Sequence, residues 1–181
     1  MENVAIDRTF WNKRKVFVTG HTGFKGSWLS LWLQMLGADV TGYSFAPNTN
    51  PSMYLSADVD LGMISNIGDI RDQRSLEKAI NGDKPEIIFH LAAQPIVRRS
   101  YADPIETFST NVMGTANLLE ICRKQSNLLA AVIITSDKCY NNVEWVWGYR
   151  ETDGLGGPDP YSASKGAAEL VIRSHVKSFF P

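Results

Sequence analysis

Short apolar runs alternate along the chain with longer segments in which apolar residues recur every three or four positions. The runs are rich in β-branched residues and end at glycine or polar residues, which predicts strands over residues 15–19, 38–44, 63–67, 86–91 and 130–135. The longer segments predict helices over residues 28–36, 71–81, 108–125 and 162–179. Because alternating strands and helices build parallel sheets, the pattern predicts an α/β fold, a doubly wound parallel sheet with helices on both faces.

Two long connections interrupt this alternation, over residues 46–61 and 141–159. Loops of this length in a compact domain are usually functional. Only five strands are predicted, whereas dinucleotide-binding sheets of this kind usually have six. Pro181 also follows directly on a helix whose apolar residues need a neighbour. We therefore expect residues 1–181 to be an incomplete domain, the N-terminal part of a longer protein.

Composition narrows the possible partners. The 181 residues are 44% hydrophobic and 20% charged, with a net charge of -1, which is typical of one globular domain. Near-neutral charge argues against nucleic acid or an anionic membrane as a partner. Cys122 and Cys139 have neither metal-binding nor CxxC spacing, so we expect two reduced thiols in a cytoplasmic protein. The apolar stretch at residues 28–36 is too short to span a bilayer.

A glycine-rich turn joins the first predicted strand to the first predicted helix. Gly20, Gly23 and Gly26 allow a tight turn and the close approach of a pyrophosphate to the helix start. The GxxGxxG spacing meets the GxGxxG fingerprint only in part, so a glycine-rich turn without a ligand is the alternative. Lys25, inside this turn, either attracts a phosphate or is simply solvated. Such a turn favours binding of a dinucleotide.

Polar and small residues follow the later strands. The second strand ends in Tyr43 and Ser44 without an acid for the ribose 2′-hydroxyl, so the sequence does not separate NAD from NADP. Asp69 either accepts a hydrogen bond from the adenine amino group or caps a turn. The small residues at 91–93 would let backbone approach a ligand. Asn111, a poor helix former, suggests polar packing or a bridging water.

Tyr161 and Lys165 lie four residues apart in the last predicted helix, and therefore on one face. An ammonium group near a phenol favours the phenolate, which can take a proton from a sugar hydroxyl. Ser136, Asp137 and Lys138 follow the fifth strand, at the edge of an open α/β sheet where ligands bind. A polar exit from the strand is the alternative. Together with the glycine-rich turn, the two clusters favour proton abstraction by Tyr161 while a cofactor removes the hydride.

These segments resemble the extended short-chain dehydrogenase/reductase superfamily over nearly the whole chain. The most specific segments are Thr19-Gly20-x-x-Gly23-x-x-Gly26, Gly68-Asp69-Ile-Arg-Asp72, His90-Leu-Ala-Ala93, Asn111-Val-Met-Gly-Thr115 and Tyr161-Ser-Ala-Ser-Lys165. The segments at 18–28, 135–140 and 144–151 look like those of the dehydratases that act on CDP-glucose, whereas relatives acting on dTDP-glucose carry Thr-Asp-Glu in place of Ser136-Asp137-Lys138. The resemblance implies a Rossmann-like fold, NAD as cofactor and a nucleotide-sugar substrate, CDP-glucose. It also implies that residues 1–181 are the NAD-binding domain and that the C-terminal, substrate-binding part is absent.

The resemblance also implies a reaction and roles. Hydride leaves C4 of the glucosyl ring, water is lost from C5 and C6, and the hydride returns to C6. Tyr161 would be the base for the 4-hydroxyl, Lys165 would lower the tyrosine pKa and bind the cofactor ribose, Ser136 would hold the 4-oxygen, and Asp137 would protonate the leaving 6-hydroxyl. Lys138 would either take the C5 proton or pair with Asp137.

We predict the cofactor contacts to come from Gly20, Gly23, Phe24, Lys25, Gly26, Tyr43, Ser44, Asp69, Ile70, Leu91, Ala92, Ala93, Asn111, Thr135, Tyr161 and Lys165. Arg98 and Arg99 either anchor substrate or pack against the last helix. A homodimer through the helices at 108–125 and 162–179 is expected from the resemblance. Two other functions stay open: a sugar epimerase or reductase of the same superfamily, which does not need Asp137, and a noncatalytic dinucleotide-binding module.

Overall fold

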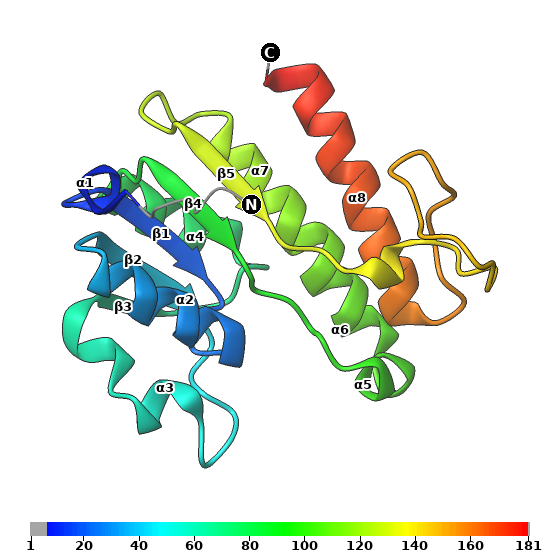
Figure 1. The fold of residues 1–181 in the computed structure, drawn as a ribbon, viewed down its shortest axis with the longest axis horizontal. Coiled ribbons are helices and arrows are strands. Elements are labelled where there is room, and N and C mark those ends of the chain that lie inside the picture. Colours follow the sequence, from blue (N-terminus) through cyan, green and yellow to red (C-terminus); the bar gives the residue numbers. More distant parts are fainter. Residues whose placement is uncertain (1–6, 181) are drawn as a thin grey trace.

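Five parallel strands form the single sheet of the computed structural model, which describes residues 7–180. Their spatial order is β3-β2-β1-β4-β5, and every neighbouring pair is parallel (Figure 1). The strands are β1 (Lys15–Thr19), β2 (Asp39–Ser44), β3 (Ile64–Ile67), β4 (Ile87–His90) and β5 (Ala130–Ile133). The predicted doubly wound parallel sheet is therefore confirmed, with each strand within two residues of its expected bounds.

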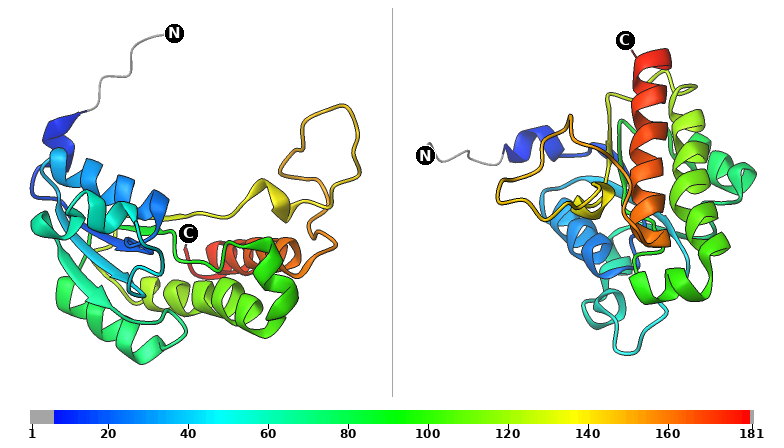
Figure 2. Two further views of the ribbon diagram at one scale, coloured as in Figure 1. Left: turned by 90° about the horizontal axis from the view of Figure 1, so that it is seen from below. Right: turned by 90° about the vertical axis from the view of Figure 1, so that its right-hand side faces the viewer.

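Helices cover both faces of this sheet. α2 packs on one face, and α4 packs on the other beside α7, as the two views of Figure 2 show. α8 lies side by side with α7 and also contacts α5 and α6. The helical elements are α1 (Arg8–Trp11), α2 (Phe24–Met35), α3 (Met53–Ser56), η1 (Val59–Gly62), α4 (Gln73–Asp83), α5 (Val97–Ala102), α6 (Pro104–Phe108), η2 (Ser109–Met113), α7 (Gly114–Cys122), η3 (Asp137–Cys139) and α8 (Pro160–Phe179).

The strand residues alternate between two apolar cores. Phe17 and Ile88 point toward α4 and α7, where they meet Leu76 and Leu118. Val16, Val18 and Val40 belong to the second core, on the α2 side, with Leu33 of that helix. A strand places successive side chains on opposite faces, so a buried strand must be apolar at every position, as β1 is from Val16 to Val18.

The structure corrects several predicted boundaries. The first helix begins at Phe24 rather than residue 28, because the glycine turn itself starts the helix and Gly23 is its N-cap. The helix predicted over 108–125 begins at Pro104, where Asp103 accepts a hydrogen bond from the Glu106 amide, and it contains the π-helical turn η2. The connection at 46–61 is not purely a loop, since it contains α3 and most of η1.

β5 lies at one edge of the sheet, and most of its residues are exposed. Val132 and the following Ile134 keep 40% of their surface accessible. Beyond β5 the chain crosses to α8 through η3, which packs against that helix (Figure 1). Within residues 7–180, none of the helices combines the length and the apolarity that crossing a lipid bilayer requires.

Candidate active site

The glycine-rich turn lies at the point where the order of the strands reverses, between β1 and β4. Gly20 has a φ of 77°, which side-chain-bearing residues rarely adopt. A Cβ atom on Gly20 would lie 2.7 Å from the amide nitrogen of Ala92, so the turn packs backbone to backbone on the exit of β4. The predicted residues Leu91 and Ala92 thus lie against Gly20. Such a crevice is where open α/β sheets bind nucleotides.

The start of α2 closes over this turn. A Cβ atom on Gly26 would lie 2.0 Å from the carbonyl oxygen of Gly20, so only glycine allows the helix to begin here. Gly23 supplies no side-chain cap, and the first amides of a helix have no partner within it. Phe24 and Lys25 are exposed in this first turn. The turn therefore offers backbone N–H donors and the positive end of a helix to an anion.

Side chains within the turn bind it to β2 and β3. Thr22 Oγ1 donates to the carbonyl oxygen of Phe45 and lies 2.8 Å from Ser44 Oγ, so the predicted Ser44 is held at the end of β2. His21 is fully buried, with Nε2 2.7 Å from Ser65 Oγ, and burial lowers its pKa to about 4. Tyr54 donates to the same Ser65 oxygen. A neutral His21 therefore links the turn to β3 and, through Ser65, to Tyr54 of α3.

The predicted adenine side of the site centres on Asp69. Arg71 binds both carboxylate oxygens of Asp69 through Nε, and its Nη2 lies 2.6 Å from Oδ2. The Asp69 pKa is lowered: its partial burial acts to raise it, but the hydrogen bonds and charge of Arg71 outweigh that effect. Tyr43 donates to the Asp69 carbonyl oxygen, and a hollow of about 640 Å³ reaches both residues. Asp69 is therefore an ionised acceptor; Ile70, beside it, is buried.

A chain of hydrogen bonds fixes the tautomer of His90 at the end of β4. Thr115 Oγ1 donates to the carbonyl oxygen of Asn111, so it must accept the proton of His90 Nε2, 3.1 Å away. His90 Nδ1 then accepts from Thr19 Oγ1 at 2.7 Å, and Thr19 accepts from the Ala92 amide. Complete burial and the nearby charge of Lys165 lower the His90 pKa to about 3. His90 is thus a neutral link between β1, β4 and α7.

Asn111 joins the exit of β4 to α8. Its Oδ1 accepts from the Gln94 amide, and its Nδ2 donates to the Gln94 carbonyl oxygen and to Ser164 Oγ. Both ends of the side-chain amide are satisfied in the buried space, and Asn111 lies within the π-helical turn η2, a distortion often found at functional sites. The expectation of polar packing is confirmed. The contact with Ser164 places Asn111 beside the residue that precedes Lys165.

Tyr161 and Lys165 lie in the first half of α8, one helical turn apart. Asp159 caps the helix, and Ser100 of α5 accepts from the Tyr161 amide at 3.1 Å. Tyr161 and Lys165 expose only 7% and 6% of their surface. Lys165 Nζ points to the carbonyl oxygen of Ile134 at 3.4 Å. Burial lowers the Lys165 pKa, and the charge of Glu169 acts in the opposite direction.

Ser136, Asp137 and Lys138 form the turn η3 and its N-cap. Ser136 Oγ accepts from the Lys138 amide at 3.2 Å and donates to Asp137 Oδ1 at 3.0 Å. Behind them, a Cβ atom on Gly166 would lie 3.1 Å from the Cys139 carbonyl oxygen, so the turn packs tightly on α8 one residue beyond Lys165. The two predicted catalytic clusters are thus on adjoining elements. Asp137 and Lys138 are exposed, so the described chain alone does not supply the dry surroundings their expected roles need.

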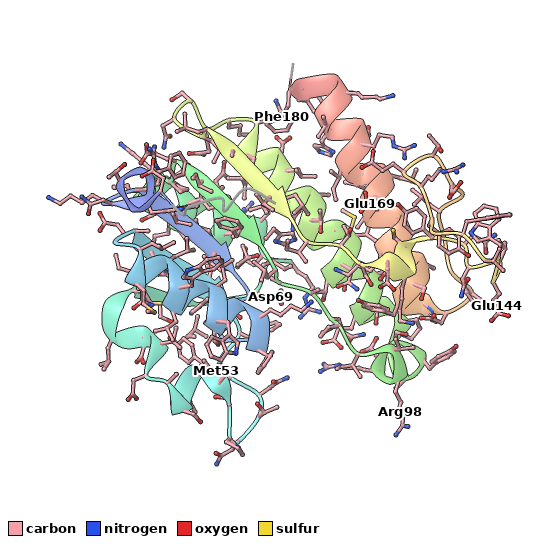
Figure 3. All side chains as sticks on the ribbon, in the orientation of Figure 1. Met53, Asp69, Arg98, Glu144, Glu169 and Phe180 are labelled. Atoms are coloured by element: carbon pink, nitrogen blue, oxygen red, sulfur yellow. The ribbon has the colours of Figure 1, made fainter. Side chains whose placement is uncertain are left out.

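Arg98 and Arg99, which were expected either to anchor substrate or to pack on the last helix, occupy two different surroundings. Arg99 pairs with Glu106 of α6, with two hydrogen bonds of 2.6 and 2.7 Å. Arg98 points away from the body of the molecule (Figure 3). The contact of α5 with α8 is made instead by Ser100. Of the two alternatives, packing against the last helix is not what these side chains do among the described residues, and anchoring of substrate stays a prediction.

Other structural members of the site were not predicted from the sequence. His21, Thr19 and Thr115 have hydrogen-bond partners 25 to 71 positions away, so no local pattern reveals them. Glu169 binds Thr135, and its spacing of four residues from Lys165 is the one local signal that could have pointed to it.

The sequence and the fold of the chain are similar to those of several known proteins. Residues 17–179 match the protein family described as GDP-mannose 4,6 dehydratase. The chain is 59% identical over 175 residues to a CDP-glucose 4,6-dehydratase from Salmonella typhimurium, covering 97% of this chain and 49% of that protein. The structure of a UDP-glucose 4-epimerase from Thermus thermophilus in complex with NAD is 30% identical, with a TM-score of 0.78 over 91% of this chain and 51% of that one.

A second solved structure is a double mutant of a dTDP-glucose 4,6-dehydratase from Streptomyces venezuelae, with NAD bound. It is 28% identical, with a TM-score of 0.76 over 91% of this chain and 52% of that one. The chain spans about half the length of the curated relatives it matches.

Proposed function

The chain belongs to the GDP-mannose 4,6-dehydratase family, within the extended short-chain dehydrogenases/reductases, and on that premise we propose that it is the dinucleotide-binding and catalytic part of a CDP-glucose 4,6-dehydratase. The observation that carries the proposal is the packing of η3, with Asp137 and Lys138, on the same stretch of α8 that holds Tyr161 and Lys165. The 59% identity to the Salmonella typhimurium enzyme supports CDP-glucose as the substrate. In the proposed enzyme, a further part, not contained in residues 1–181, completes the substrate pocket.

The residues at the crevice fit NAD. The glycine contacts at Gly20 and Gly26 bring backbone within reach of a pyrophosphate, and the first amides of α2 are available to it. We assign Ser44 to the adenosine ribose and Asp69 to the adenine amino group. Arg71 favours the ionised form of Asp69, in which both carboxylate oxygens are acceptors. NAD, when bound, would accept the hydride from C4 of the sugar and return it at C6.

We assign the first proton transfer to Tyr161. A phenol with little exposure is a weak acid, and a neighbouring ammonium favours its ionised form. Lys165 supplies that charge from the next turn of α8. Asn111 and His90 do not contact the substrate in this proposal. Their hydrogen bonds fix α8 relative to the ends of β1 and β4. The Tyr161 phenol and the Lys165 ammonium group are thereby held at a constant position relative to the crevice.

We assign the elimination of water to η3. Ser136 Oγ, at the start of the turn, would hold the 4-oxygen of the sugar. Asp137 would protonate the leaving 6-hydroxyl, and Lys138 would take the C5 proton, which acidifies once C4 is a ketone. Both side chains are exposed in the described chain, and their roles need a raised acid pKa and a lowered lysine pKa. The proposal therefore requires that bound substrate and the further part of the enzyme cover η3.

Two assembly features belong to the same proposal. α7 and α8 lie side by side, and exposed apolar residues on this helical layer include Met113, Leu170 and Val176, which suits a homodimer formed through these helices. Cys122 and Cys139 are both buried and unpaired, which suits a cytoplasmic enzyme.

An epimerase is the second candidate, because UDP-glucose 4-epimerases are among the most similar solved structures. Epimerization uses the tyrosine and lysine but no acid for a leaving hydroxyl. Asp137 is what favours dehydration over it.

The test uses a chimera in which this chain replaces the matching half of the Salmonella typhimurium relative. CDP-glucose is added, and the alkali-induced absorbance of a 4-keto sugar is measured. We expect absorbance with the parent chimera and almost none with Tyr161→Phe, which loses the proton acceptor while keeping the ring. Copurified NAD reports that each chimera is folded. A folded, NAD-containing chimera that gives no 4-keto sugar from any nucleotide-linked glucose would refute dehydration.

A further inference from the structure

The face of α8 that carries Tyr161 and Lys165 continues for one more turn to Glu169. Residues 161, 165 and 169 are spaced by four and therefore lie along one side of the helix. Figure 3 shows Glu169 halfway along α8, beside the chain that leaves β5. Neither the proton transfer assigned to Tyr161 nor the elimination assigned to η3 uses this carboxylate, although it lies at the centre of the site.

Glu169 and Lys165 hold consecutive residues of the β5 exit. Thr135 Oγ1 donates to Glu169 Oε1, and Lys165 Nζ donates to the carbonyl oxygen of the preceding residue, Ile134. Ser136 follows immediately. Two successive turns of α8 therefore fix the position from which η3 begins. Glu169 contributes through its side-chain hydrogen bond with Thr135.

Among the groups around Lys165, Glu169 is the acid whose charge favours the ammonium form. From β4, His90 faces Lys165 as a neutral imidazole whose pKa is lowered to about 3. From η3, Cys139 is a thiol whose pKa is raised by burial and by Glu169 itself. From its own helix, the Glu169 charge raises the Lys165 pKa, while burial of the ammonium lowers it more. Asp137 and Lys138 of η3 lie exposed to solvent.

We propose that Glu169 is the positioning residue of this site: through Thr135 it sets the start of η3 against α8, and its carboxylate is the counter-charge that keeps the buried Lys165 an ammonium ion. The inference rests on the proposed function for its catalytic meaning, because a charged Lys165 is what favours the Tyr161 phenolate.

The sign of the effect follows directly. A buried lysine loses its proton at lower pH than a solvated one, and a nearby carboxylate opposes that loss. Without the Glu169 charge, Lys165 would become neutral at a lower pH. The positive charge that Lys165 offers to Tyr161 would then be lost from the alkaline side of the pH range.

The first test measures Lys165 without turnover. The chain is labelled with ¹³C at lysine Cε, the Lys165 resonance is assigned with Lys165→Met, and its titration is followed by NMR. Glu169→Gln keeps an oxygen that accepts from Thr135 but removes the charge, so the Lys165 pKa should fall. Thr135→Val keeps the charge but removes the bond, so the pKa should not fall. Glu120→Gln, an equal charge change in an exposed pair with Arg123, should leave Lys165 unaltered.

An unchanged Lys165 titration in folded Glu169→Gln would overturn the inference. If that variant does not fold, the unsubstituted chain gives the answer through the ¹³Cδ resonance of Glu169. That resonance should show a second step at the pH where Lys165 titrates, and its absence would also overturn the inference.

The second test separates this inference from the proposed function. In the chimera, Glu169→Gln should lower kcat/KM for dehydration roughly fivefold relative to Glu120→Gln at the alkaline end of the profile, with little loss near neutrality. A parallel loss at every pH would indicate a merely structural role and would contradict the inference. If the parent chimera produces no 4-keto sugar, dehydration fails, while the NMR titration still decides the Lys165–Glu169 coupling.

Discussion

Gly20→Ala tests the backbone packing on which the whole crevice depends. The residue has a φ of 77°, and a new Cβ atom would lie 2.7 Å from the Ala92 amide nitrogen and 2.9 Å from the Leu91 carbonyl carbon. The left-handed conformation costs a side-chain-bearing residue about 1–2 kcal/mol. Forcing the two strand exits apart costs about 1–3 kcal/mol more, because the obstacles are backbone atoms that cannot rotate away. We expect a total loss of roughly 2–5 kcal/mol.

The assay is urea and thermal unfolding of the chain, followed by circular dichroism. In a domain of this size, a loss of that magnitude lowers Tm by roughly 4–20 °C. Gly82→Ala is the matched control. A Cβ atom on Gly82, within α4, meets nothing within 4 Å, and alanine should stabilise the helix by about 0.5–1 kcal/mol. A free energy of unfolding for Gly20→Ala within about 0.5 kcal/mol of that of the unsubstituted chain would refute the packing argument.

Two further predictions follow from single side chains. His90 should remain neutral, protonated on Nε2, from pH 5 to 9, because burial lowers its pKa to about 3 and the hydrogen-bond order permits only that tautomer; ¹⁵N NMR of the imidazole checks this, and an Nδ1–H signal would contradict it. Asp83→Asn should raise stability at pH 7 by roughly a few tenths of a kcal/mol and give no gain near pH 3, where Asp83 is already protonated. The reason is that partial burial raises the Asp83 pKa. Thermal unfolding at both pH values checks this, and an equal change of stability at pH 7 and pH 3 would contradict it.

The sheet and the glycine turn could be predicted because their signals are local. Apolar runs such as Val16–Val18 are buried on both faces and leave no ambiguity about the strand. The spacing of Gly20, Gly23 and Gly26 likewise encodes a turn that only glycine can form. Helix starts were less predictable. α2 begins inside the glycine turn because Gly26 packs on Gly20, a contact that helix propensity does not encode.

The residues that support the site could not be identified from local sequence patterns. Thr19 and His90 are 71 positions apart, and His21 and Ser65 are 44 apart, so their pairing depends on the order of strands in the sheet. The role of Arg99 stayed open for the same reason, since its partner Glu106 lies on the short helix α6, which the sequence pattern did not reveal. The sequence was enough to place Tyr161 and Lys165 on one face of a helix. It was not enough to predict the burial that lowers the Lys165 pKa.

Following the hydrogen at C4 tests the central proposal most directly. The chimera is incubated with CDP-glucose carrying deuterium at C4, and the product is examined by NMR and mass spectrometry. A 4,6-dehydratase should yield a 4-keto-6-deoxy sugar nucleotide with the deuterium at C6. Deuterium retained at C4 of an inverted sugar would indicate an epimerase, and a product without transfer to C6 would contradict the proposed dehydration.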